Sequence, residues 1–281
     1  LILPGLAFWS DVSNPFGIAI INIGYKVVSL FPLLPFTGAL EKLADKLVPG
    51  EDRESGELIL DDRLLSTPSL AVARCDDAAS TMAALSFESL RMSLRALGSY
   101  DQAQADEVRR MESEVDMYED KLGTYLVKLS GSSNMTENDS HEVTKLLHVL
   151  GDIERISDHA VNVIESAEEV KDKGLHFSDR AKKEIEVLCR AIDEIVTLTA
   201  KAFISGDMQA AAQVEPLEQV VDHLRDEIKD HHVIRLQNSE CTIELGFVLS
   251  DILTNLERVC DHCSNIAGCI IEISHNVLDM H

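Results

Sequence analysis

Aromatic residues are scarce in this chain of 281 residues, because Phe, Trp and Tyr together make up only 5% of it. Proline and glycine are also sparse beyond residue 70. Sheets and the tight turns between strands draw on these residues more heavily than helices do. The composition therefore favours long helices, and we predict an all-α fold.

Positive charge is in short supply as well. The chain has 25 Lys and Arg residues against 49 Asp and Glu residues, which gives a net charge of −24. A surface of this sign repels the phosphate backbone of DNA and RNA, so we exclude nucleic acid as a partner. The excess of acid fits either a solvated acidic surface or a protein that binds cations.

The sequence lacks the motifs of common enzymes. We find no nucleophile–base constellation, glycine-rich phosphate loop or zinc-protease motif. The six cysteines lie in apolar helical patterns, which indicates packed, reduced thiols. Cys260 and Cys263 form a Cys-x-x-Cys pair, but a second pair at zinc-site spacing is missing. We predict neither a zinc site nor an enzyme.

The first 48 residues differ in kind from the rest. Residues 16–40 are almost wholly apolar, with Lys26 as the only charge, and about 20 such residues span a bilayer. Pro32 and Pro35 would bend a helix here, and Lys26 would have to face protein or water. We predict a transmembrane helical segment, with a buried hairpin of a soluble protein as the alternative. A charged linker marked by Gly and Pro follows over residues 49–65.

A nine-residue motif occurs twice in the remaining chain. Residues 154–162 read ERISDHAVN and residues 257–265 read ERVCDHCSN, so Glu, Arg, Asp, His and Asn are shared. Residues four apart lie on one helix face, which aligns the Glu, Asp and Asn of each copy in a stripe of oxygen-bearing side chains. Carboxylates at this spacing repel each other by roughly 0.2–0.5 kcal/mol. Such a stripe faces either water or a cation.

Two further Glu-x-x-x-Asp pairs precede the two motif copies. Glu112 and Asp116 lie 42 residues before the pair of the first copy. Glu218 and Asp222 lie 39 residues before the pair of the second copy. The chain therefore contains two copies of one unit, displaced by just over a hundred residues.

Capping and helix-breaking residues divide each unit into three helices. We expect helices over 67–97, 101–129 and 139–173 in the first unit, and over 178–206, 216–236 and 238–275 in the second. Three of these helix starts rest on particular residues. They are a capping box of Asp139 with Glu142, a helix start at Pro216, and a cap at Asn238 or Ser239.

Apolar residues at steps of three and four run beside each motif copy. The predicted core stripes are Leu146, Leu147, Leu150, Ile153, Ile156, Ala160 and Val163 in the first unit and Leu249, Ile252, Leu256, Val259 and Ile266 in the second. They place the acidic stripes at the rim of the buried face.

The acidic pairs are the predicted metal ligands. Carboxylates are hard oxygen ligands that suit iron, manganese or another divalent metal, and four pairs at duplicated positions favour a metal over a solvated helix face. The ligand set is Glu112, Asp116, Glu154, Asp158, Glu218, Asp222, Glu257 and Asp261. Four motif residues could hydrogen-bond to these ligands and orient them: His159, Asn162, His262 and Asn265. The alternative is that they are ordinary surface or interface residues. We expect Arg155 and Arg258 to pair with acids across the bundle.

Two other functions use a similar arrangement. A structural helical adaptor would present the same acidic face without a metal. A di-iron carboxylate oxidase would place Glu and Glu-x-x-His on facing helices. Here the His follows the Glu by five residues rather than three. Metal analysis separates the adaptor from a metal protein, and an oxygen-consumption assay separates the oxidase.

The doubled motif, the two three-helix units and the earlier acidic pairs resemble the PhoU-like family over residues 66–275. The resemblance implies two tandem three-helix bundles, covering residues 66–173 and 177–275. It also implies a role in phosphate regulation, with clusters of iron or related metals on the acidic surface. A homo-oligomer or a regulatory protein partner would fit that role.

The segment before the first bundle is similar to a second family. Residues 60–71 resemble the junction between membrane part and PhoU-like part in bacterial sodium/phosphate cotransporters, and residues 14–16 and 34–36 resemble the edges of their last membrane segment. This implies a fragment in which residues 1–48 end a transport domain of the inner membrane and a PhoU-like domain lies in the cytoplasm. Sodium and phosphate would be the transported ions. The family's transport repeats are absent here, and Asn22 and Lys26 stand where it usually has His and Asn.

Overall fold

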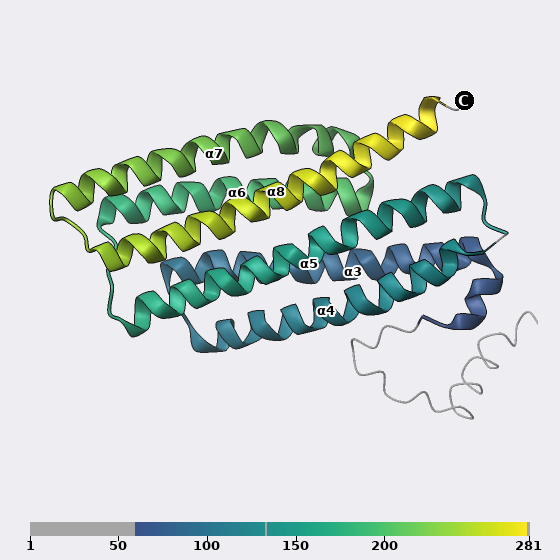
Figure 1. Ribbon diagram of the computed structural model, residues 1–281, viewed down its shortest axis with the longest axis horizontal. Helices are drawn as coiled ribbons and strands as arrows, with labels where there is room; N and C mark the ends of the chain where they lie inside the picture. Colours follow the sequence, from purple (N-terminus) through teal and green to yellow (C-terminus); the bar gives the residue numbers. More distant parts are fainter. Residues whose placement is uncertain (1–59, 133, 280–281) are drawn as a thin grey trace, which may run out of the picture. The chain divides into compact units, whose positions relative to one another are not determined.

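The computed structural model describes residues 60–132 and 134–279, and this part of the chain is helical (Figure 1). A 3₁₀ helix, η3, precedes six α-helices, and there is no strand among the described residues. The elements are η3 (Asp62–Ser66), α3 (Pro68–Gly98), α4 (Gln102–Ser130), α5 (Glu137–Asp172), α6 (Asp179–Ser205), α7 (Met208–Gln237) and α8 (Ile243–Asp279). The prediction of an all-α fold is confirmed for these residues.

The predicted membrane segment over residues 16–40 lies outside the described residues, as do the rest of residues 1–48 and most of the linker. Within residues 60–132 and 134–279, no helix combines the length and the apolar character needed to cross a bilayer. The prediction of a transmembrane segment therefore remains a prediction.

Side-chain caps explain most helix starts. Asp101 accepts a hydrogen bond from the backbone N–H of Gln104 at the start of α4, and Ser178 accepts one from Ala181 at the start of α6. Each bond satisfies a donor that the first helical turn leaves free. α6 ends at Ser205 and is capped by Gly206, whose φ of 64° lies in the left-handed region that glycine adopts without a Cβ penalty.

Three predicted helix limits are wrong. In the capping box before α5, Thr136 is the cap and Asp139 bonds back to it. Asp139 is therefore the third residue of α5 rather than its cap. α7 begins at Met208, because Asp207 accepts from two backbone N–H groups there, and Pro216 lies inside the helix. α8 begins later than predicted, after Thr242, whose hydroxyl accepts from the N–H of Leu245.

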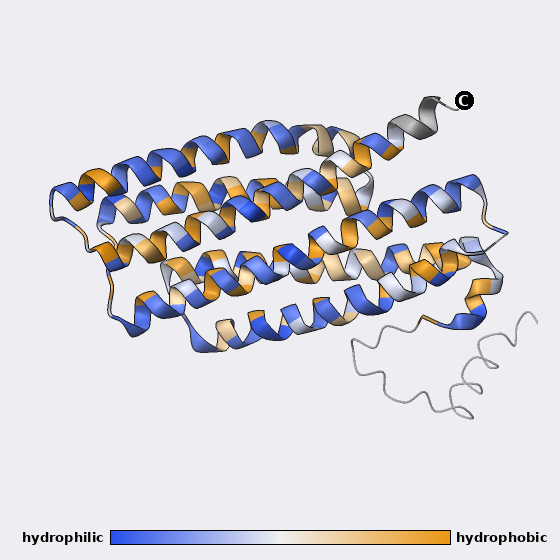
Figure 2. Cartoon of the chain, in the orientation of Figure 1, coloured by the Kyte–Doolittle hydropathy of each residue, from blue (hydrophilic) through white to orange (hydrophobic). Residues whose placement is uncertain are grey.

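The six α-helices pack as two groups of three. α3, α4 and α5 pack on one another, as do α6, α7 and α8, and the main contact between the groups joins α5 to α8. Figure 2 shows largely hydrophilic residues along α4 and α7, the two helices at the margins of the view. The apolar faces of each group point inward, so burial of those faces stabilises the arrangement.

Buried serines tie α3 to α5. The hydroxyl of Ser86 donates to the carbonyl of Ile153 at 2.7 Å, and that of Ser93 donates to the carbonyl of Ala160 at 2.8 Å. Both serines and both carbonyl residues are seven positions apart, which is two helical turns. The two bonds fix the register of α5 against α3, and with it the direction in which the motif residues on α5 point.

The predicted core stripes are buried with one exception. All five predicted residues of α8, and six of the seven on α5, are at most 2% exposed. Leu147 is 38% exposed and lies off the stripe, so its prediction as a core residue is wrong. Leu146 and Leu150, four residues apart, already fill the face that α5 turns to its neighbours.

Candidate metal centre

The first unit brings its two acidic pairs together. α4 carries Glu112 and Asp116, and α5 carries Glu154 and Asp158; we call these four residues the first acidic patch. Glu112, Asp116 and Asp158 each offer one carboxylate oxygen, and the three oxygens lie within 4.8 Å of one another. In the described residues this is the only group of three such ligand atoms. Carboxylate oxygens are the ligands that hard divalent cations take.

The carboxylates of the first acidic patch disfavour one another's charge. Burial, and then the charge of Asp158, raise the pKa of Glu154 to about 7. Burial and the charge of Asp116 raise the pKa of Glu112, and burial and the charge of Asp158 raise that of Asp116. Both causes penalise the ionised form. A bound cation would remove this penalty, so the donor set fits a hard metal ion.

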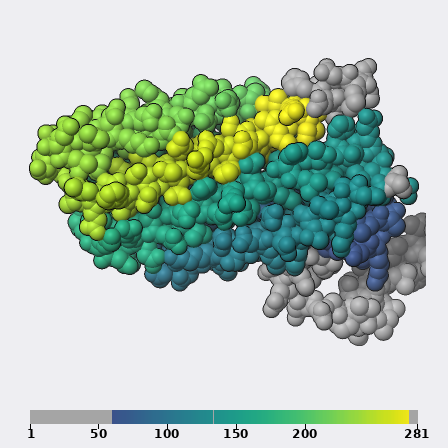
Figure 3. Space-filling view, in the orientation of Figure 1, coloured from purple at the N-terminus to yellow at the C-terminus, as the bar shows by residue number. Residues whose placement is uncertain are grey.

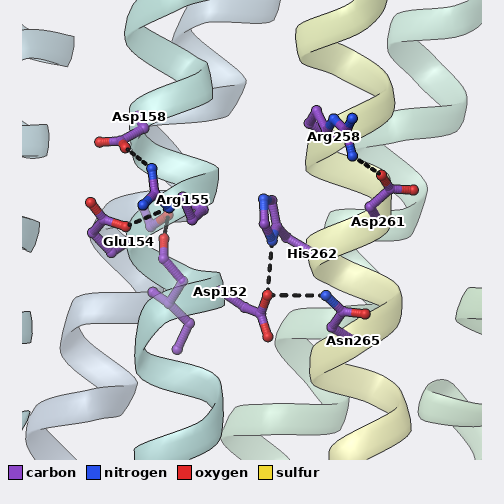
Figure 4. Close-up of polar contacts among 10 residues, drawn as sticks. Asp152, Glu154, Arg155, Asp158, Arg258, Asp261, His262 and Asn265 are labelled. Carbon is purple, nitrogen blue, oxygen red and sulfur yellow. Dashed lines mark hydrogen bonds and ion pairs between the residues drawn. The ribbon is translucent and has the colours of Figure 1, made fainter.

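Arg155 is the basic residue of the motif, and it does not reach across the bundle. Its guanidinium lies 3.6 Å from Glu154 and 3.3 Å from Asp158 on its own helix, and its side chain is 61% exposed. Arg258 makes the equivalent contact with Asp261 at 3.3 Å on α8 (Figure 4). The prediction of acid partners across the bundle is therefore wrong for both arginines. Exposed pairs of this kind contribute little to stability.

The second unit places its acidic residues differently. Glu218 and Asp222 lie on α7, and Glu257 and Asp261 lie on α8; we call these four the second acidic patch. The guanidinium of Arg225 contacts Asp222 at 2.8 Å and also forms an ion pair with Glu257. Burial, followed by the charge of Asp222, raises the pKa of Glu218. This patch therefore holds a positive side chain of the protein among its carboxylates.

The motif histidines and asparagines face the other unit. In the first unit, Nδ1 of His159 donates to Oδ1 of Asn255 at 2.9 Å, and the amide of Asn162 donates to the same oxygen at 3.1 Å. Burial lowers the pKa of His159, which favours the neutral ring. His159 and Asn162 therefore lie at the interface between α5 and α8 rather than among the metal ligands.

The second unit repeats this arrangement. Nδ1 of His262 donates to Oδ1 of Asp152 at 2.8 Å, and the amide of Asn265 donates to it at 3.2 Å; Figure 4 shows both side chains directed at Asp152. Asn255 lies 103 positions after Asp152, as His262 lies after His159. Sequence reasoning missed Asn255 and Asp152. Aligning the two units would have paired them, but nothing in the alignment says that they accept from the opposite unit.

The cysteine pair lies in the core. Cys260 and Cys263 are at most 2% exposed and form no disulfide. Burial raises the pKa of Cys263 to about 12. Zinc ligation needs thiolates, and burial in an apolar setting opposes their formation.

A cavity of about 680 Å³ lies elsewhere, where the end of α3, the end of α5 and the start of α6 meet. Its lining is mainly apolar, with Lys171 and Lys182 among the polar groups. None of the predicted site residues lines it. The cavity and the acidic patches are therefore separate features.

The sequence model of the PhoU domain matches residues 79–167 and 185–270, which together make up more than half of the chain. This chain belongs to the PhoU domain family. The two PhoU matches fall on the two groups of three helices, and the first and second acidic patches lie within them.

Curated PhoU relatives are accessory proteins of phosphate transport. The chain is 24% identical over 194 residues to the phosphate-specific transport system accessory protein PhoU homolog 1 of Thermotoga maritima, covering 69% of this chain and 83% of the relative. It is 26% identical over 164 residues to a PhoU homolog of the same description from Deinococcus radiodurans, covering 57% and 74%. These descriptions name an accessory role in phosphate transport, which agrees with our prediction that this chain is not an enzyme.

Solved PhoU structures share the fold. The crystal structure of PhoU from Pseudomonas aeruginosa aligns with a TM-score of 0.68 at 21% identity, over 75% of this chain and 99% of that one. The phosphate transport system regulatory protein PhoU from Streptococcus pneumoniae aligns with a TM-score of 0.65 at 16% identity, over 74% and 97%. These alignments establish the PhoU-like architecture of the described residues.

Proposed function

We propose that residues 66–275 are a cytoplasmic regulatory domain for phosphate transport, and that residues 1–65 connect it to a sodium-dependent phosphate transporter of the bacterial inner membrane. Membership of the PhoU domain family supports the regulatory role, since the relatives are accessory or regulatory proteins of phosphate transport. The apolar stretch over residues 16–40 supports the attachment to a membrane. Sodium and phosphate would be the cargo of the whole transporter.

Membrane attachment is tested by comparing the chain with a version that begins at residue 60. The full chain should sediment with phospholipid vesicles and need detergent for extraction, whereas the shortened version should stay in the supernatant. If the full chain also stayed in the supernatant without detergent, the membrane part of the proposal would fail. Regulation is then tested by sodium-dependent phosphate uptake in cells that produce the transporter with and without this domain.

The same proposal includes a metal ion, with iron, manganese or another divalent metal held by the first acidic patch. The observation that carries it is the convergence of the Glu112, Asp116 and Asp158 oxygens within 4.8 Å. Glu154, on the same patch, would complete or orient the set. The metal would join α4 to α5 and offset the repulsion that raises the pKa values of these carboxylates. A metal that binds only the folded chain stabilises it by mass action.

The metal proposal is tested by elemental analysis and by melting temperature with Mn²⁺ and with a chelator. The parent should carry metal and melt higher with Mn²⁺, by several degrees if binding adds about 1–3 kcal/mol. Asp158→Asn should lose most of this shift, and its metal-free form should be no less stable than the metal-free parent, because a repelling charge is gone. Asp172→Asn is the control, since it removes one exposed carboxylate from the end of the same helix. A parent with no metal and no shift would leave only an acidic helical adaptor.

A further inference from the structure

Arg225 occupies the centre of the second acidic patch. Its side chain is only 13% exposed, and its guanidinium lies 2.8 Å from Asp222 and 3.0 Å from Asp226, both on α7. It also forms an ion pair with Glu257 on α8. A planar guanidinium with five N–H donors can hold several carboxylates at once. Arg225 therefore joins two helices of the second unit through their acidic residues.

Within residues 60–132 and 134–279, the first unit has no cation at the equivalent position. Glu112 and Glu218 lie 106 positions apart, as do Asp116 and Asp222, and the residue 106 positions before Arg225 is Glu119. Its carboxylate lies beside Gly123 of its own helix, with 3.9 Å between Oε1 and the place a Cβ would take there. The same position on the second helix of each unit thus carries an acid in one unit and a base in the other.

The remaining charges of the two patches match. Each patch has two carboxylates from its second helix and two from its third, and each has one exposed motif arginine, which is 61% exposed in both units. The second unit adds the acid Glu215 near Glu218, where the first unit has Arg109, which pairs with Glu168. Arg225 is therefore the difference in positive charge among the patch carboxylates. Among the described residues, the cation paired with carboxylates of the first acidic patch is the exposed Arg155. In the second acidic patch, the mostly buried Arg225 of α7 supplies the counter-charge.

We propose that Arg225 is the permanent cation of the second acidic patch, so that the chain binds its metal at the first acidic patch alone. This inference rests on the proposed metal function and narrows it to one unit. To enter the second patch, a metal would have to displace a guanidinium from Asp222 and Glu257 and leave that largely buried charge with Asp226 as its one remaining partner. Removing partners from a buried charge is costly. The duplication of the acidic pairs therefore does not produce two equal metal sites.

Four single substitutions in the full chain test the proposal, with Mn²⁺ as the probe and equilibrium dialysis as the measurement. Asp158→Asn should weaken Mn²⁺ binding at least about tenfold, whereas Asp261→Asn should leave the bound Mn²⁺ unchanged. Arg225→Gln should increase the Mn²⁺ bound per chain, because it frees the second patch. Glu119→Arg should lower it, because it brings the counter-charge of the second unit into the first.

The double variant Asp158→Asn with Arg225→Gln isolates the second patch. It should regain the Mn²⁺ binding that Asp158→Asn loses. Equal losses in Asp158→Asn and Asp261→Asn, or no gain from Arg225→Gln in a chain that circular dichroism shows to be helical, would overturn the proposal. Arg110→Gln is the matched control, because Arg110 is a 56% exposed arginine of α4 paired with acids of its own helix.

Melting temperature without metal separates this inference from the metal function itself. Arg225→Gln should lower it by several degrees relative to the parent, and Arg110→Gln should change it little. If the parent bound no Mn²⁺ but Arg225→Gln still lost stability in this way, the metal function would fail and the role of Arg225 as counter-charge would stand. If Arg225→Gln melted like Arg110→Gln, the role of Arg225 would fail whatever the parent bound.

Discussion

The imidazole rings of His159 and His262 stack on each other, with their centroids 5.6 Å apart and their planes at 25°. Each histidine belongs to one copy of the repeated motif. α5 and α8 lie against each other (Figure 3) and run in opposite directions (Figure 1). The Nδ1 of each ring donates to a residue of the opposite helix. The histidine and asparagine of the motif therefore join the two units, while its Glu and Asp form the acidic patches.

Asp152 should tolerate an amide but not a methyl group. Its counterpart Asn255 accepts the same two hydrogen bonds through an amide oxygen and uses its Nδ2 to donate to the carbonyl of Asp251. Asp152→Asn should therefore change the free energy of unfolding by less than about 0.5 kcal/mol. Asp152→Ala leaves His262 and Asn265 without their acceptor and should cost about 1–2 kcal/mol. Urea unfolding of both variants measures the difference, and equal losses would contradict the shared role of the two acceptors.

Glu154 should make the metal-free protein more stable at acidic pH. Its folded-state pKa is raised to about 7, mainly by burial, so between pH 8 and 5.5 the folded chain takes up a proton that the unfolded chain does not. The stability from this group is present at low pH and is lost as the pH rises through 7. We expect roughly 1–2 kcal/mol after allowing for solvent screening.

The measurement for Glu154 is urea unfolding with a chelator at pH 5.5 and 8. Glu154→Gln should remove this part of the pH dependence and should be more stable than the parent at pH 8. Glu165→Gln, an exposed change on the same helix, serves as control and should follow the parent. A parent and a Glu154→Gln variant with parallel pH profiles would show that burial does not shift this carboxyl group.

Gly246 is required by a close contact between α7 and α8. A Cβ added there would lie 2.7 Å from Nε2 of His232, whose ring is almost fully buried. Gly246→Ala should destabilise the fold by about 1–2 kcal/mol despite the better helix propensity of alanine. Gly268→Ala on the same helix meets nothing within 4 Å and should stabilise it by about 0.5–1 kcal/mol.

Unfolding midpoints of both glycine variants in urea test this contrast. A second substitution, His232→Ala, removes the clashing ring and should make Gly246→Ala less costly than it is in the parent. The same cost in both backgrounds would place the strain somewhere other than at His232.

Much of the fold is predictable from the sequence because the signals are local. Apolar periodicity, with caps such as Asp101 and Ser178, gave six helices and most of the core, since these patterns act within a few turns. The misplaced helix start at Pro216 has a local cause too. A proline inside a helix costs one hydrogen bond, and the cap at Asp207 with the continuous packing of α7 outweighs that loss.

The duplicated sequence by itself determined which residue types recur and at what spacing. Residues at the same spacing in both units lie on the same face of the corresponding helix. The duplication could not determine which recurring residues meet. His159 and His262 lie 103 positions apart and stack only because α5 packs against α8. In the sequence, nothing distinguishes Arg225 from other basic residues on helices. The packing of α7 against α8 brings it to Glu257. Tertiary structure alone decided these contacts, because the partners lie on different helices and their meeting depends on how those helices are rotated and shifted against each other.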